Sequence, residues 1–240
     1  MKHANFAHTH VYRESNVSLF SYARMKTTLL RSFLMVSLIS VATSIVAKPP
    51  TLKQLFMSMP GSVLALDSAR RSDLMAYYFD KKVDSVSNGM NGYIHIRLWD
   101  ENAHHLILQT SRRGTLELQV FDKGNPEFIA ISKTVCAPAC LSRLSFYTLN
   151  WDLLSIPSPD IHASDFLKTT LSAYDSTQAM VWMTPMFVRY SFDASRASII
   201  ATCDQKDFLG KSDWKGLQPD MKTSELRFIF HQGEWKPASK

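Results

Sequence analysis

The sequence predicts an α+β fold, in which a curved antiparallel β-meander packs against a few short helices. Residues 93–99 and 116–121 alternate between apolar and polar side chains, which is typical of half-buried strands. Residues 67–79 instead carry Leu74, Tyr77 and Tyr78 at helical spacing. Because short helical segments flank a long series of alternating segments, an antiparallel sheet covered by helices is favoured.

Two helices are expected before the sheet. The first spans residues 51–57 and stops at Met59-Pro60, because proline disfavours helical geometry in the residue before it. The second spans residues 67–79. Residues 88–92, with the sequence Asn-Gly-Met-Asn-Gly, then form a strong turn signal before the first long strand.

Loop lengths predict which strand residues pair, because a slip of one residue exchanges the two faces of a strand. A three-residue loop at residues 112–114 and a hairpin closed by residues 137–139 fix two of the registers. The predicted cross-strand pairs are Leu108 with Leu118, Leu106 with Val120, Trp99 with His105, Leu98 with Leu106, Ile96 with Leu108, and Ala130 with Phe146. One apolar face then continues across a meander of five or six strands.

Further elements are expected after residues 155–160, which form a surface connection rich in proline and serine. A helix capped at residues 164–165 is predicted to continue to Leu171. Strands follow at residues 179–192 and 197–203, and Asp204 caps a short helix toward Trp214. A strand at residues 225–231, a turn at residues 232–233 and a returning strand at residues 234–236 complete the chain.

Residues 25–47 are predicted to be a secretory signal peptide. Lys26 and Arg31 give it a positive start, residues 33–42 are largely apolar, and Ala47 offers the small residue needed at a cleavage site. The apolar run is shorter than the roughly 20 residues of a membrane-spanning helix, which favours cleavage over an uncleaved anchor. Residues 1–24 are then an upstream extension outside the fold, and residues 48–240 form a single domain.

The formal net charge of +6 does not indicate a nucleic-acid-binding protein. Residues 1–47 hold five basic residues and one acidic residue, so the remainder has 22 basic and 20 acidic residues (27 less 5, and 21 less 1). This near balance provides no stripe of positive potential that could follow a phosphate backbone. We therefore expect no nucleic-acid partner.

Five short motifs are distributed over the chain: Leu55-Phe-Met-Ser-Met-Pro60, Arg71-Ser-Asp-Leu-Met75, Phe146-Tyr-Thr-Leu-Asn-Trp151, Asp165-Phe-Leu167 and Gly233-Glu-Trp235. Their order resembles that of a bacterial family of exported proteins catalogued only as domain of unknown function family 3256. The resemblance implies a small exported protein of Gram-negative anaerobes, and it implies no activity or catalytic residues. The sequence departs from the family at Cys140, where a second cysteine so near Cys136 is not expected.

Cys136 and Cys140 are expected to form a disulfide. A three-residue loop places them opposite each other on adjacent strands, within the roughly 5.5–6 Å between Cα atoms that disulfides prefer. The oxidising compartment implied by export favours the bond. Two alternatives remain: separate thiols, or a bond between Cys203 and one of the pair. A redox-active role is disfavoured because a hairpin tip, unlike a helix N-terminus, does not activate a thiol.

No catalytic, metal-binding or cofactor-binding site is predicted. His104 and His105 are adjacent on a strand, so they point to opposite faces and cannot easily ligate one ion. His95 shares a face with His105 but lies roughly 13 Å away along the strand. Residues 210–212, Gly-Lys-Ser, resemble the end of a phosphate-binding loop, but Gln205 stands where that loop requires glycine.

Two surfaces are candidates for binding. The outward face of the meander is expected to carry aromatic and charged side chains suited to a glycan or a peptide: Tyr93, Arg97, Trp99, His105 and Glu117. Residues 180–187 contain methionine and aromatic side chains, which adapt to varied apolar ligands. The alternatives are a solvated or covered sheet face for the first surface, and ordinary core for the second.

The favoured function is a non-enzymatic binding or interaction module in the periplasm or outside a Gram-negative cell, with a protein, glycan or lipid partner in the envelope. Three alternatives remain. A lipid-carrier-like half-barrel would hold an apolar ligand in its concavity, and a small hydrolase would assemble its site only in the fold. The third is a purely structural or envelope-assembly protein. An apolar cavity larger than about 300 Å³ would support the carrier, whereas a buried acid–histidine–serine contact opening to a cleft would support the hydrolase.

Overall fold

The computed structural model describes residues 49–80, 85–89, 91–122 and 127–238. The chain divides into two units between Lys48 and Pro49, and all described residues belong to the second. The predicted upstream extension and signal peptide therefore lie outside the described residues. Of the helices in the described ranges, none combines the length and the apolar character needed to span a membrane.

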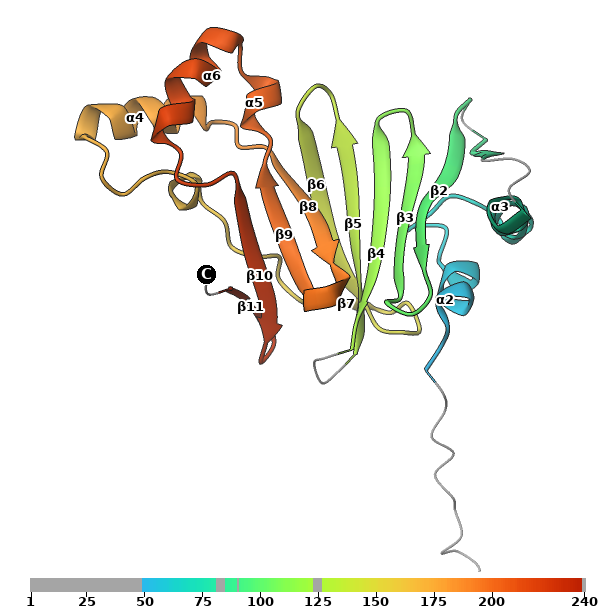
Figure 1. The fold of residues 1–240 in the computed structure, drawn as a ribbon. Helices are drawn as coiled ribbons and strands as arrows, with labels where there is room; N and C mark the ends of the chain where they lie inside the picture. Colours follow the sequence, from blue (N-terminus) through green and yellow to red (C-terminus); the bar gives the residue numbers. More distant parts are fainter. Residues whose placement is uncertain (1–48, 81–84, 90, 123–126, 239–240) are drawn as a thin grey trace, which may run out of the picture. The chain divides into compact units, whose positions relative to one another are not determined.

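Seven strands that follow one another along the chain form an antiparallel sheet in the same order (Figure 1). This result confirms the predicted meander and extends it beyond five or six strands. The connections are short, so each strand lies beside its neighbour in sequence. The strands are β1 (Val86–Ser87), β2 (Tyr93–Asp100), β3 (His105–Ser111), β4 (Gly114–Phe121), β5 (Phe128–Cys136), β6 (Cys140–Tyr147) and β7 (Leu153–Leu154).

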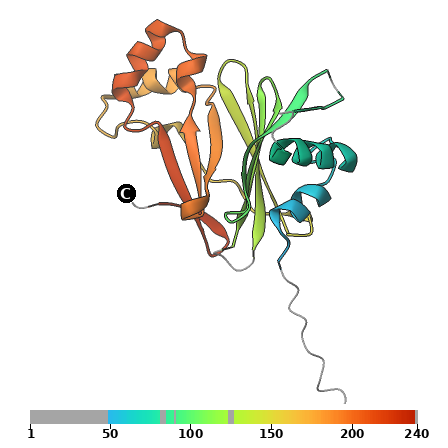
Figure 2. The same ribbon diagram turned by 45° about the vertical axis from the view of Figure 1, so that its right-hand side comes forward.

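Two helices, α2 (Leu52–Ser58) and α3 (Ser68–Asp80), lie on one face of this sheet (Figure 2). Both were predicted, within one residue at each end. Helix α2 begins with a capping box, in which Thr51 accepts a hydrogen bond from the Gln54 N–H and the Gln54 side chain accepts one from the Thr51 N–H. The apolar side chains of both helices pack on those of the central strands, which include Leu106, Leu108, Leu116 and Leu118.

A second antiparallel sheet covers the opposite face of the first (Figure 2). It is formed by β8 (Val188–Asp193), β9 (Ser198–Cys203), β10 (Glu225–His231) and β11 (Glu234–Pro237), in the order β11-β10-β9-β8. The core between the two sheets is rich in aromatic side chains, which include Phe121, Phe128, Phe146, Phe192, Phe228 and Trp235. The central part of the seven-stranded sheet is thus covered on both faces, although its strands alternate in the manner of a half-buried sheet.

The prediction of a strand from residue 179 is wrong, because residues 173–182 form helix α4 (Ala173–Trp182). Ser172 caps this helix by accepting a hydrogen bond from the Asp175 N–H. The following strand, β8, begins only at Val188. An apolar run such as residues 179–183 fits either a helix or a buried strand, so the polar cap ahead of it was the better signal.

The helix predicted over residues 164–171 is also wrong. Only a single 3-10 turn, η1 (Ala163–Asp165), forms there. Directly after this turn, the Phe166 carbonyl accepts a hydrogen bond from the Lys222 N–H, and Leu167 forms an isolated bridge with Met221. Pairing with a distant segment therefore replaces the helical hydrogen bonds that the local sequence favours.

The region after β9 is helical, as predicted from Asp204 onward. It contains α5 (Gln205–Phe208), α6 (Lys211–Leu217) and the 3-10 turn η3 (Gln218–Asp220), while the 3-10 turn η2 (Ala194–Arg196) connects β8 and β9. Gly210 is the N-cap residue of α6. The phosphate-loop-like residues 210–212 therefore belong to an ordinary helix start.

Two predicted registers need correction. The loop between β3 and β4 has two residues, and the register shifts once more between Gln109 and Ser111, so Leu108 pairs with Leu116 and Leu106 pairs with Leu118. A bulge between Ile96 and Leu98 shifts the β2–β3 pairing, so that Trp99 lies opposite Leu106 and not opposite His105, and Leu98 lies opposite Ile107. A bulge adds one residue to one strand, which no loop-length argument can detect. The pairs Ile96 with Leu108 and Ala130 with Phe146 are confirmed.

Candidate functional site

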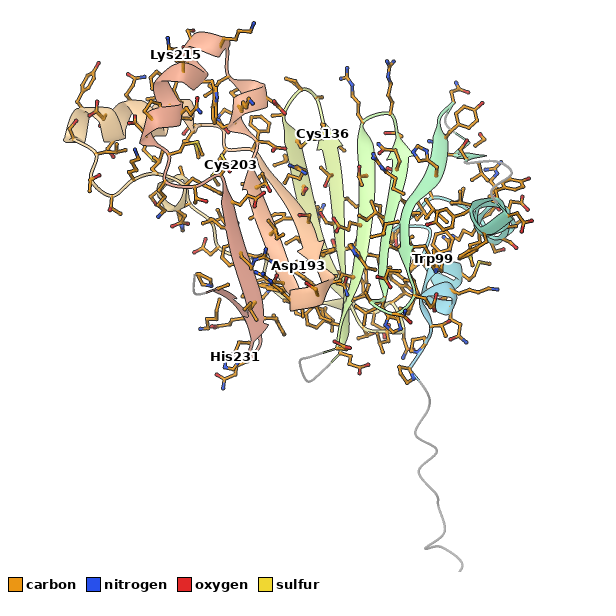
Figure 3. All side chains as sticks on the ribbon, in the orientation of Figure 1. Trp99, Cys136, Asp193, Cys203, Lys215 and His231 are labelled. Atoms are coloured by element: carbon orange, nitrogen blue, oxygen red, sulfur yellow. A yellow bond between two sulfur atoms is a disulfide. The ribbon has the colours of Figure 1, made fainter. Side chains whose placement is uncertain are left out.

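The five residues predicted to share one outward face lie in different environments. Tyr93 and Arg97 are exposed, whereas His105 and Glu117 are buried beneath the second sheet. Trp99 packs among the helices, with its ring edge-on to that of Phe56 at a centroid distance of 5.8 Å (Figure 3). The β2 bulge and the covering strand β8 therefore divide the predicted binding surface, and the five residues do not form one exposed face.

The buried pair His105 and Glu117 supports the edge of the second sheet. Glu117 Oε1 lies 2.8 Å from His105 Nε2 and accepts a hydrogen bond of 3.0 Å from the Phe192 N–H of β8. Glu117 is therefore bound both to a neighbouring strand of its own sheet and to the main chain of the other sheet. The contact has the residue types of an acid–base pair but serves to join the two sheets.

Two serines of the first sheet contribute to the same junction. Ser142 Oγ accepts a hydrogen bond from the Tyr190 N–H, and Ser132 Oγ donates one to the Tyr190 carbonyl. Strand β8 is the edge strand of its sheet, so these main-chain groups have no strand partner. Unpaired buried main-chain groups are costly, and here the polar side chains of β4, β5 and β6 satisfy them.

The disulfide between Cys136 and Cys140 is present. The two residues are a cross-strand pair at the end of the β5–β6 hairpin, as predicted, although their Cα atoms are only 3.9 Å apart (Figure 3). Cys203 is a buried free thiol, so the alternative pairing is excluded. Burial raises the pKa of the Cys203 thiol, which makes it a poor nucleophile near neutral pH. In the described part of the chain, no group of three or more candidate ligands is placed to hold a metal ion.

A charged cleft lies beside β10, and we call it the β10 cleft. Its volume is about 670 Å³, and four separate parts of the chain contribute to it: the segment around η1, the turn η2, β10 with the residues before it, and the end of β11. The lining residues are Asp160, His162, Asp165, Arg196, Lys222, Thr223, Glu225, Leu226, Arg227, Phe228, Pro237 and Ala238. Positive and negative side chains thus face the same space.

Some of the cleft side chains are held in place by neighbours. Arg227 Nη1 donates hydrogen bonds of 2.7 Å to Asp193 Oδ2 and to Ser198 Oγ. A hydrogen bond from the Ser195 hydroxyl lowers the pKa of Asp193, and Arg227 lowers it further, although burial acts in the opposite direction. Asp193 therefore keeps its negative charge and holds Arg227 in place. The exposed His162 ring lies between two carboxylates, 3.9 Å from Asp160 and 4.0 Å from Asp165.

A second, shallower hollow lies on helix α4. Ser176, Thr177, Met180, Val181 and Thr184 line it, and Val181 is 61% exposed. It includes part of the predicted apolar segment at residues 180–187. Other members of that segment have different roles, because Met183 is buried in the core between the two sheets and the Phe187 ring packs at a tilt against that of Phe208.

No sequence pattern indicates the β10 cleft. Its charged residues come from segments up to about seventy residues apart, and each of these segments has an ordinary solvated composition. Only the folding of the η1 segment against Lys222 brings them together. Sequence reasoning found the strands that carry Arg227 and Glu225 but could not place them opposite residues 160–165.

Comparison with known proteins gives a family and a fold. The profile of a family described as protein of unknown function (DUF3256) matches residues 42–235. A solved structure of a domain of an uncharacterized protein from Porphyromonas gingivalis W83 is similar, with a TM-score of 0.66 and 19% sequence identity, over 79% of this chain and 98% of that chain. At this identity the likeness shows a shared fold alone. No curated protein matches the chain. The chain therefore belongs to the DUF3256 family, as its five motifs predicted.

Proposed function

We propose that the protein is an exported, non-enzymatic binding module and that the β10 cleft holds a polar ligand. The observation that carries this proposal is the cleft itself. Its volume of about 670 Å³ lies within the usual range of ligand sites. Arg196 and Lys222 can bind carboxylate or hydroxyl oxygens, while Asp160 and Glu225 can accept hydrogen bonds. A peptide or glycan segment with both donors and acceptors suits this lining.

The role of His105 and Glu117 supports binding over hydrolysis. These two groups form the closest acid–histidine contact in the described residues, and both are engaged at the junction with β8. Neither lines the β10 cleft or the hollow on α4. A hydrolase would need a hydrogen-bonded acid–histidine pair at the wall of a cleft. In the β10 cleft the exposed His162 ring lies 3.9 Å from Asp160 and 4.0 Å from Asp165, beyond hydrogen-bond distance.

The filled interior supports binding of a polar ligand over transport of a lipid. Apolar side chains from two helices occupy one face of the seven-stranded sheet, and aromatic side chains of the second sheet occupy the other. The β10 cleft has a strongly charged lining, which does not suit an acyl chain.

Export is supported by the positive start, apolar run and small residue at residues 25–47 and by the disulfide. The test is fractionation of the producing cells, followed by intact mass measurement of the natural protein. We expect a periplasmic or secreted species that begins at residue 48 and carries the bridged cysteines. A cytoplasmic species that retains Met1 or Met25 would contradict export.

Native mass spectrometry of the natural protein tests the cleft. We expect a co-purified ligand that is lost from the Lys222→Glu variant. Lys206→Glu is the matched control, because it makes the same charge change at an exposed lysine that does not line the cleft. Equal ligand retention by both variants would place the binding site elsewhere, and a protein that never carries a ligand would contradict the proposal.

A further inference from the structure

One end of the seven-stranded sheet exposes two aliphatic side chains. Val135 of β5 and Leu141 of β6 lie opposite each other on the face that α2 and α3 cover elsewhere, and they are 60% and 53% exposed. On β4 the residue opposite Val135 is Gly114, which has no side chain to cover it. This part of the sheet is therefore apolar, but the helical layer does not cover it.

Four cations surround these side chains. Lys133 and Arg143 form the next cross-strand pair on the same face. Arg112 and Arg113 form the exposed β3–β4 turn. This turn lies beside the end of β5, because the Arg113 carbonyl accepts a hydrogen bond from the Cys136 N–H. We call these four cations, together with Val135 and Leu141, the basic patch.

The positive charge of the basic patch is not balanced within the described chain. None of its four cations forms an ion pair with a described carboxylate. Like charges directly opposite each other destabilise a sheet. In agreement, burial and then the charge of Arg143 lower the pKa of Lys133. An anionic partner would remove this repulsion.

The edge of β6 beside the basic patch also lacks a strand partner. Strand β7 pairs only with Phe146 and Tyr147, at the far end of β6. The Thr148 N–H points toward β7, where it donates to the Asp152 carbonyl. Along a strand, the main-chain N–H and C=O groups of successive residues point alternately to the two neighbouring strands. Cys140 and Ser142 are an even number of residues from Thr148, so their main-chain groups point to the same side of β6 as those of Thr148, at a place that β7 does not reach. No main-chain hydrogen bond to another described segment satisfies these groups.

We propose that the first half of β6 accepts an extended acidic segment of another protein as an added strand. The added main chain would pair with Cys140 and Ser142, and its alternate side chains would lie beside Leu141 and Arg143. The preferred segment therefore carries an aliphatic residue and a carboxylate two positions apart. Its remaining side chains are small, because Tyr190 of β8 occupies the other face at Ser142.

The charges favour such a partner over copies of this chain. Two β6 edges paired around a two-fold axis would bring the cations of two basic patches together, which is unfavourable. Residues 1–47 are a poor occupant for the same reason, since they carry five basic residues and one acidic residue. An anionic membrane could attract the cations, but it would leave the main-chain groups of Cys140 and Ser142 without a strand partner.

The test uses the full disulfide-bonded protein and a synthetic peptide of sequence Thr-Val-Thr-Glu-Thr-Val-Thr-Glu-Thr with blocked ends. We expect the peptide to bind and to protect the amide protons of Cys140 and Ser142 from exchange, as measured by NMR. Arg143→Glu should weaken binding by about fivefold. The same variant should favour a peptide with lysine in place of glutamate. Arg97→Glu is the matched control, because Arg97 is an exposed cation on β2, far along the same sheet.

Four outcomes would overturn the proposal. The first is no binding at millimolar peptide. The second is binding without protection of the two amides, which would indicate charge attraction alone. The third is protection that rises with protein concentration in the absence of peptide, which would identify a second copy as the occupant. The fourth is binding to phosphatidylglycerol vesicles, but not to the peptide, which would identify a membrane surface.

Discussion

The Glu117 carboxylate lies at the junction of the two sheets, where the residue is only 8% exposed. One of its carboxylate oxygens serves the His105 ring and the Phe192 N–H together. The alternation of β4 correctly placed Glu117 on the face opposite the helices. What the alternation could not show is that another sheet covers this face, because strand β8 is about seventy residues away in the sequence.

Replacing Glu117 tests its structural role. Glu117→Ala should lower the free energy of unfolding by about 2–4 kcal/mol, because it leaves a buried N–H and a buried imidazole without their acceptor. Glu117→Gln keeps an acceptor oxygen and should lose clearly less. Urea titration followed by tryptophan fluorescence gives the values. The exposed Glu234→Ala is the control, and an equal effect of both alanine variants would contradict the assignment.

Asp193 makes stability depend on pH in the acidic range. Its pKa is lowered in the folded protein, chiefly by the Ser195 hydroxyl. The unfolded value is about 3.9. The ionised group therefore stabilises the fold above that pH, and this contribution is lost as the pH falls through the lower folded pKa. Asp193→Asn should be less stable than the parent protein at neutral pH, and the difference should shrink in acid. A constant difference in unfolding free energy from pH 7 to pH 2 would contradict this prediction.

At the level of elements, the helix pair α2–α3 is held by one buried cation. Arg71 of α3 is 4% exposed, and its guanidinium donates hydrogen bonds to the carbonyls of Phe56, Met57 and Met59 at the end of α2 and to that of Leu64. A cation at a helix C-terminus is favoured by the helix dipole. The planar guanidinium can reach carbonyls on two sides at once.

Replacing Arg71 should therefore loosen the helical layer. Arg71→Ala should lower the free energy of unfolding by about 3 kcal/mol, because several buried carbonyls lose their donor. Arg71→Lys should recover less than half of this loss, since a single ammonium cannot reproduce the two-sided contact. The neighbouring Arg70→Ala, at an exposed residue paired with Asp67, should change stability by less than about 1 kcal/mol. Chemical denaturation of the three variants measures these differences, and similar losses for Arg70→Ala and Arg71→Ala would contradict the prediction.

At the scale of the whole described unit, an aromatic cluster holds the two sheets together. Trp235 of β11 contacts rings from both sheets, with centroid distances of 5.5 Å to Phe121, 5.7 Å to Phe146 and 5.0 Å to Phe230. Strand β11 has only four residues, all paired with β10, and Trp235 is the buried one among them.

Trp235→Ala should be among the most destabilising single substitutions, with a loss of about 3–5 kcal/mol in unfolding free energy. The cavity would open between the sheets, so near-ultraviolet circular dichroism should weaken more than the far-ultraviolet signal. Tyr174→Ala removes an aromatic ring that is 77% exposed and should leave stability within about 0.5 kcal/mol of the parent. Comparable stability of both variants would show that the cluster does not join the sheets.

Several of the family motifs contact one another in the folded chain. Arg71 of the second motif binds the carbonyls of the first, and the Trp151 indole of the third donates to Ser58 of the first. Trp235 of the last motif packs on Phe146 of the third. Four of the five motifs therefore contact one another and help to hold this fold together.

The sequence by itself determined the local structure: the meander, the two leading helices, the disulfide at the hairpin tip and the family. These features depend on side-chain period, turn residues and short motifs, which act over a few neighbouring positions. The tertiary structure alone decided the β2 bulge, the burial of His105 and Glu117, and the β10 cleft. Each of these depends on a contact between a main-chain group or a charge and a partner far away in the chain. Such long-range contacts leave no periodic pattern in the sequence of either segment.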